Sequence, residues 1–132
     1  MSGGVLLVAN ETVAGDAVHA PVDLHDAEVL VVAPALNGRI AFWSSAEDGA
    51  RRAAAQRLER SLEVLAAAGV AASGRVGDAN PLLAIEDALR TFAAEEIVVV
   101  TQPEHRSHWL AHEIAARARA RFPHPVHEIV AA

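Results

Sequence analysis

The 132-residue sequence contains no cysteine and no lysine, and these two absences exclude several kinds of chemistry. Without cysteine the chain can form no disulfide, no thiolate nucleophile and no cysteine-based metal site. Without lysine it can form neither a Schiff base nor a phosphate-binding loop of the type that ends in lysine. All eleven basic residues are therefore arginine.

Aromatic residues are scarce, at 4% of the chain, and no apolar run approaches the roughly 20 residues that a membrane-spanning helix needs. The formal net charge is −6. Basic residues do not cluster with aromatic ones, which argues against nucleic acid as a partner. The N-terminus shows no basic region followed by an apolar stretch and a cleavage site, so we expect a cytoplasmic protein with no membrane association. The length fits one domain, and we expect residues 1–132 to form it.

Short apolar runs alternate with helical patterns along the whole chain. The runs at residues 5–9, 28–33 and 97–100, which are continuously apolar except for Glu28 at the start of the second, are typical of strands that are covered on both faces. A weaker strand pattern with a polar interior occupies residues 70–76, and we expect it towards an edge of the sheet. A last strand is predicted at residues 126–130. This alternation predicts an α/β fold of three layers, with a parallel sheet and right-handed crossovers.

Helix start and stop signals lie between the predicted strands. Overlapping Ser-x-x-acid caps predict that a helix begins at Ser44 or Ser45, and Gly69 is its predicted C-cap. Asn80 suits the N-cap of a second helix, and Pro81 suits its first position because no N–H is needed there. The segment between the first two strands has room only for a short helix.

The segment after the strand at residues 97–100 is the first place to look for function. A polar loop leads to Arg106 and Ser107, and Ser107 is the predicted N-cap of a helix that runs to about residue 121. A helix start carries unpaired N–H groups and a partial positive charge. In an α/β sheet it is therefore a ready site for an anion or a phosphate.

Several short motifs occur in a familiar order. The first strand ends at the polar residue Asn10, a Val-Gly-Asp-Ala-Asn-Pro turn occupies residues 76–81, a Glu-Ile-Val-Val-Val-Thr strand occupies 96–101, and a Pro-Val pair begins the last strand. In this order and spacing, which span nearly the whole chain, they resemble the universal stress protein family. The resemblance implies a doubly wound, Rossmann-like sheet of five strands in the order 3-2-1-4-5. It also implies a stress-related or regulatory role without catalysis.

ATP-binding members of that family carry a glycine-rich motif after the fourth strand. The corresponding segment here, residues 101–118, contains no glycine, and Asn10 and Glu11 stand where the family has an acidic residue. Glycines let the backbone approach the phosphates closely, so we expect that ATP is not bound in the family's usual way. A nucleotide or another anionic small molecule is expected to bind weakly or differently. Two alternatives stay open: a genuine ATP-binding protein with an altered loop, and a dimeric interaction scaffold with no small ligand.

In a sheet of this order, a ligand lies outside the carboxyl ends of strands one and four, where the strand order reverses. The ordinary alternative is that residues there serve only as helix caps and turns. No catalytic residue, metal ligand or resident cofactor is predicted. The candidate ligand-binding residues around this crevice are Asn10, Glu11, Ala33, Asp78, Thr101, Gln102, Arg106 and Ser107.

His108 and His112 lie one helical turn apart, with His105 nearby, but they lack the order of the zinc-protease motif. We interpret them as surface histidines, and the alternative is a metal or hydrolase site.

Two further segments bear on partners. The apolar loop at residues 40–43 either packs over its own sheet, lines a pocket or contacts a partner. The last strand is expected at an edge, where unpaired backbone groups need a partner or a cover. Members of the universal stress protein family commonly dimerise there. The resemblance therefore implies a homodimer through Val126, Glu128, Ile129 and Val130.

Overall fold

A computed structural model describes residues 4–9, 24, 27–35, 46–78, 80–101 and 106–130 of the chain. It contains a five-stranded parallel sheet in the order β3-β2-β1-β4-β5, which confirms the predicted fold class and strand order. The elements are β1 (Gly4–Ala9), β2 (Glu28–Pro34), α1 (Ala46–Ala67), β3 (Ala72–Gly77), α2 (Pro81–Thr91), β4 (Glu96–Thr101), α3 (Arg106–Arg121) and β5 (Val126–Val130).

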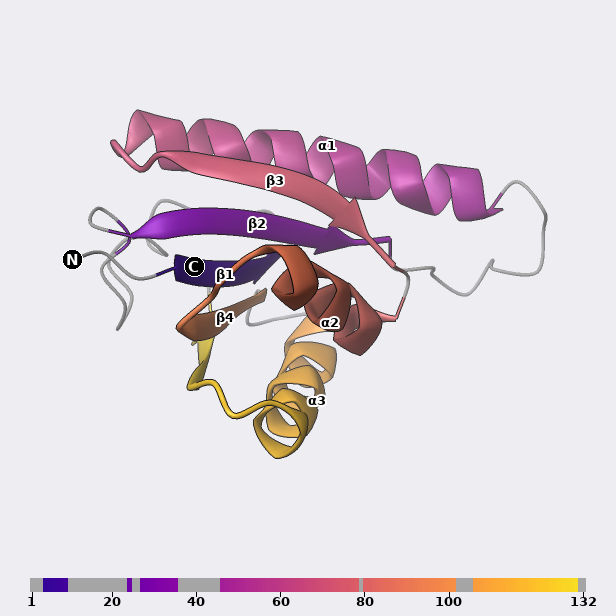
Figure 1. Cartoon of the computed structure of the whole chain (residues 1–132). Helices are drawn as coiled ribbons and strands as arrows, with labels where there is room; N and C mark the ends of the chain where they lie inside the picture. The colour runs from indigo at the N-terminus through magenta and orange to yellow at the C-terminus, as the bar shows by residue number, and fades with distance from the viewer. Residues whose placement is uncertain are drawn as a thin grey trace.

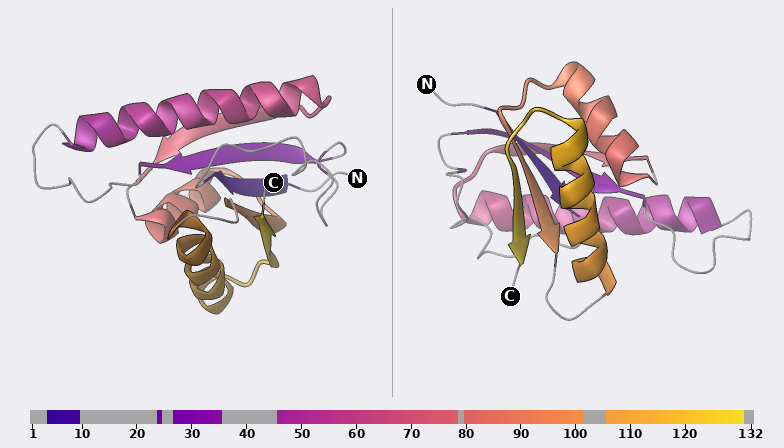
Figure 2. Two further views of the ribbon diagram at one scale, coloured as in Figure 1. Left: turned by 180° about the vertical axis from the view of Figure 1, so that it is seen from behind. Right: turned by 90° about the horizontal axis from the view of Figure 1, so that it is seen from below.

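The helices cover the two faces of the sheet unequally. Helix α1 lies on one face, whereas α2 and α3 lie on the other (Figure 1). The right-hand view of Figure 2 shows α2 and α3 in front of the strands and α1 behind them. Leu24, from the segment between β1 and β2, is buried on the α1 side. The order of layers is therefore helix, sheet, helices, as the sequence predicts.

The alternation of side chains along β1 explains how both faces are filled. Val5 and Leu7 face α1, while Leu6 and Val8 face α2 and α3, and all four are buried. Strands β2 and β4 follow the same pattern. Because successive side chains of a strand point to opposite faces, a strand covered on both sides needs an unbroken apolar run. The runs predicted as buried strands are the three central strands of the sheet.

The turn from α1 into β3 is a Schellman motif around Gly69. Gly69 has φ 82°, its N–H bonds to Ala66 O at 3.0 Å, and the N–H of Val70 bonds to Leu65 O at 2.9 Å. The predicted C-cap is confirmed. Val70, predicted as the first strand residue, instead completes this cap and is buried. Strand β3 consequently begins at Ala72, and it lies at the edge of the sheet as predicted.

Helix α2 starts where the sequence indicates and packs very close to the sheet. Asn80 Oδ1 accepts a hydrogen bond from the N–H of Leu82 at 3.0 Å, which confirms the predicted N-cap. Gly77 makes the close packing possible, because a Cβ there would lie 2.7 Å from Ala84 Cβ and 2.9 Å from Val32 Cγ1. The sequence thus predicts the cap, whereas the packing role of Gly77 is visible only in the structure.

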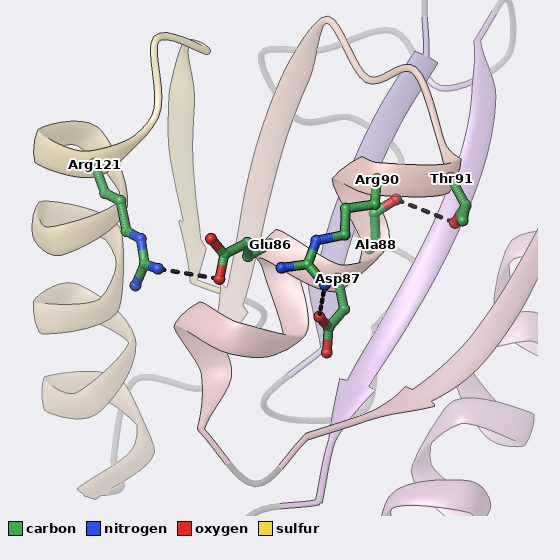
Figure 3. Close-up of polar contacts among 6 residues, drawn as sticks. All are labelled: Glu86, Asp87, Ala88, Arg90, Thr91 and Arg121. Carbon is green, nitrogen blue, oxygen red and sulfur yellow. Dashed lines mark hydrogen bonds and ion pairs between the residues drawn. The ribbon is translucent and has the colours of Figure 1, made fainter.

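Helix α3 begins at Arg106, so Ser107 lies within its first turn and the helix starts two residues earlier than a cap at Ser107 predicts. Helix ends are the boundaries that sequence locates least well, because terminal turns fray and any of several neighbouring residues can serve as the cap. On the outer surface α3 is tied to α2, where Arg121 Nη2 lies 3.1 Å from Glu86 Oε2 (Figure 3). A second ion pair, between Arg90 and Asp87, lies within α2 (Figure 3).

Candidate functional site

The carboxyl ends of the strands lie along one edge of the sheet, since all pairings are parallel. Strand β1 lies between β2 and β4, and the chain passes to β2 on one side and later reaches β4 on the other. The strand order therefore reverses beside β1. Ala9 at the end of β1 pairs with Val100, directly before Thr101 at the end of β4. This is the place predicted for a ligand in an open α/β sheet.

Helix starts lie at the same edge. Helix α2 begins shortly after β3 ends, and α3 begins shortly after β4 ends. The N-terminal part of α1 extends beyond the carboxyl ends of β2 and β3 (Figure 1). Within it Arg51, Arg52 and Ala53 are exposed. Because a helix N-terminus carries a partial positive charge, the starts of α2 and α3 contribute partial positive charge to this edge, while the exposed carboxylate of Asp78 contributes a negative one.

Arg57 is a functional candidate at this edge that the sequence pattern did not single out. Its Nε donates a hydrogen bond to Ala9 O at 2.9 Å, and its Nη2 donates one to Pro34 O at 2.6 Å. These two acceptors are the last residues of β1 and β2. A partly buried guanidinium therefore bridges the carboxyl ends of two neighbouring strands.

The structure, and not the sequence, explains the position of Arg57 on α1. It lies one turn from Ala54 and one turn from Ser61, and both of these residues are fully buried. Arg57 therefore belongs to the sheet-facing side of α1 and not to its solvent-facing side. An arginine at helical spacing from small buried residues indicates a side chain that runs along the sheet towards its edge.

Two of the predicted ligand-binding residues have described side chains. Ala33 is fully buried in a cluster with Ala35 and Ala54, so only its backbone could meet a ligand. Asp78 is exposed, and its Oδ1 accepts a hydrogen bond from the N–H of Asn80 at 2.8 Å. This bond forms an Asx turn before α2. Asp78 therefore has the turn role that the sequence analysis gave as the alternative to ligand binding.

The other predicted residues are described by backbone alone or lie outside the described residues. Thr101 ends β4, and Arg106 and Ser107 lie in the first turn of α3, so these three are near the strand-order reversal. Asn10, Glu11 and Gln102 lie outside the described residues, as does the loop at residues 40–43. The structure thus brings Ala33, Asp78, Thr101 and the start of α3 to one edge of the sheet.

The histidine group is only partly described. His105 lies outside the described residues, and His108 and His112 are part of α3 with no description of their side chains. Among the described side chains, no group of three or more His, Asp or Glu residues is placed to hold a metal ion. None of the described helices is both long enough and apolar enough to cross a membrane.

No protein-family model and no curated protein sequence matches the chain, so the fold and the residues at the carboxyl edge carry the functional argument.

Proposed function

We propose that this protein is a cytoplasmic, non-catalytic regulatory domain, related to stress responses as its resemblance to universal stress proteins suggests. Its carboxyl edge binds a nucleotide or another anionic small molecule, weakly and without the family's glycine-rich phosphate loop. The observation that carries the proposal is the reversal of strand order beside β1. Open α/β sheets bind ligands at such reversals because the connections leave in opposite directions and open a space between them.

The residues at this edge support an anion more than a cation. Helices α2 and α3 start there, and Arg57 lies across the ends of β1 and β2. The partial positive charges of helix starts favour carboxylate or phosphate groups. No glycine occurs in residues 101–118, so the backbone there has a Cβ wherever a phosphate would need close approach.

Thermal unfolding with and without Mg-ATP, at micromolar and millimolar concentrations, tests the proposal. A ligand that binds only the folded state stabilises it by RT ln(1 + [L]/Kd). For a domain of this size, about 1 kcal/mol raises the melting temperature by roughly 3 to 5 °C. We expect a rise of that order at millimolar Mg-ATP and no measurable rise at micromolar Mg-ATP.

The alternatives predict different curves. A genuine ATP-binding protein would already be stabilised at micromolar Mg-ATP, and the stabilisation would reach about 4 kcal/mol at a thousandfold excess over Kd. An interaction scaffold with no small ligand would show no rise with Mg-ATP, ADP or inorganic phosphate. That last result would refute the proposed ligand site.

The exposed edge of β5 supports a second proposal, which concerns assembly. Within the described part of the chain β5 forms strand pairs only with β4 and lies at one side of the sheet, where the backbone groups on its outer side could take up a further strand. Two copies joined in a two-fold arrangement would pair these groups with each other. The contact would involve Val126, Glu128, Ile129 and Val130.

A further inference from the structure

Arg119, in the last turn of α3, binds the backbone of β5. Its Nε and Nη2 both donate to Val126 O, at 3.2 and 2.9 Å. Arg117, two positions earlier on the same helix, pairs instead with the carboxylate of Glu113 at 2.8 Å. Arg119 belongs to an exposed part of the helix, yet its guanidinium is directed at the main chain of a strand. The contact therefore concerns the hydrogen bonding of β5.

The carbonyl of Val126 lies on the outer side of β5, away from β4. The N–H of Ile97 in β4 bonds to Pro125 O at 2.9 Å, and Ile97 lies opposite Val126 in the register of the two strands. Successive residues of a strand direct their backbone groups to opposite sides, so the carbonyl after that of Pro125 faces outward. Strand β5 is the last strand at this edge of the sheet, as the right-hand view of Figure 2 shows. Arg119 thus binds the first outward-facing carbonyl of the edge strand.

This bond occupies a position that a further strand would need. A strand that adds to an open edge bonds to the outward N–H and C=O groups of that edge. A carbonyl oxygen has two lone pairs, and both donors of Arg119 are directed at the same oxygen. The N–H of a further strand can therefore reach Val126 O only after the guanidinium has moved away. Charged side chains at edge strands are one means by which proteins limit pairing between sheets.

We infer that Arg119 limits the pairing of β5 with the same strand of a second copy, because it covers the first outward-facing carbonyl of this edge. The inference builds on the proposed assembly through β5, but it concerns the strength of that pairing and holds even if the wild type is a monomer. In a two-fold arrangement that pairs the whole of both strands, Val126 O of each copy takes part. Each copy must then release its own Arg119, so the effect acts twice in one dimer.

Removing the guanidinium should strengthen association, whereas loss of a merely structural contact should not. In Arg119→Ala we expect the dissociation constant of the dimer to fall about 10- to 100-fold, since bonds from a charged group no longer compete with strand pairing. The net charge of the chain is −6, so loss of a positive charge would by itself weaken association. Arg117→Ala makes the same change in charge but removes a bond to Glu113, and it should not lower the dissociation constant.

Sedimentation velocity over a dilution series measures the dissociation constant, and circular dichroism verifies that each variant is folded. A second substitution in Arg119→Ala locates the effect. Adding Ile129→Arg on β5 should abolish the gain in affinity, whereas adding Ser73→Arg on β3, at the other edge, should leave the gain unchanged. If Arg119→Ala does not fold, Arg119→Met replaces it, because methionine keeps an unbranched apolar chain at this position but has no N–H donor.

A dissociation constant that is unchanged or higher without the guanidinium would overturn the inference, as would an equal decrease in Arg117→Ala. A decrease that persists with Ile129→Arg would place the effect away from β5 and overturn it too. A monomeric wild type with a dimeric Arg119→Ala would support the role of Arg119 and refute the proposed wild-type dimer. A dimer of equal affinity in both would leave the assembly proposal standing without this role. If neither associates, the assembly proposal and the inference fall together.

Discussion

The close packing of α2 against the sheet depends on one residue, Gly77. Adding a Cβ would bring it to 2.7 Å from Ala84 Cβ and 2.9 Å from Val32 Cγ1, so the helix or the strand must move. We expect Gly77→Ala to lower the free energy of unfolding by about 1 to 3 kcal/mol, as overpacking of a core does. Urea denaturation followed by circular dichroism measures this change.

Gly49 provides the control for that substitution. It is exposed in the first part of α1, and a Cβ there would meet nothing within 4 Å. Gly49→Ala should raise the free energy of unfolding by about 0.5 to 1 kcal/mol, because alanine loses less backbone entropy in a helix than glycine does. Equal effects at the two glycines would contradict the packing described for Gly77.

The residues of the carboxyl edge differ in how far the sequence predicts them. Asn80 was predicted correctly because its role is local and involves a backbone N–H two positions away. Arg57 was not, because its partners lie 48 and 23 positions away and only the tertiary fold brings them together. Pattern reading also assigns charged residues to the solvent side of a helix. The structure corrects this assumption, because it shows that Ala54 and Ser61, one turn to either side of Arg57, are buried.

Helix α2 attaches to the sheet by one face, and two of its aliphatic residues test that description. Ile85 is fully buried, whereas Leu83, two positions earlier, is 39% exposed. Ile85→Ala should cost about 2 to 5 kcal/mol, since it removes buried methyl groups and leaves a cavity. Leu83→Ala should stay within about 0.5 kcal/mol of the wild type. Similar losses in urea denaturation for the two variants would contradict the orientation of α2.

Whole elements were predicted better than their ends. The apolar runs of β1, β2 and β4 located these strands, because a strand covered on both faces tolerates few polar residues. The start of β3 was placed too early, since Val70 belongs to the cap of α1 through its bond to Leu65 O. The start of α3 was placed two residues too late, since Ser107 has the residue type of a cap but lies inside the first turn.

At the level of the whole molecule, the alternation of strands and helices predicts a parallel sheet but not the order of its strands. Right-handed crossovers restrict the order without fixing it. The order 3-2-1-4-5 came from the resemblance to universal stress proteins, and the sheet confirms the order. The resemblance itself, and the function that it suggests, stay proposals. Composition agrees with the order, because the polar strand β3 lies at one edge and the apolar β1 lies in the centre.

The two edges of the sheet lead to a prediction about assembly. If copies pair through β5, Ile129→Arg should convert a dimer of the 13.9 kDa chain into a monomer, because it places two equal charges near the two-fold axis. Ser73→Arg makes a comparable change on exposed β3, at the other edge, and should leave the dimer intact. Light scattering coupled to size exclusion measures the mass, and circular dichroism verifies that each variant is folded. A wild-type monomer, a dimer that persists in folded Ile129→Arg, or one that is lost in Ser73→Arg would each exclude pairing through β5.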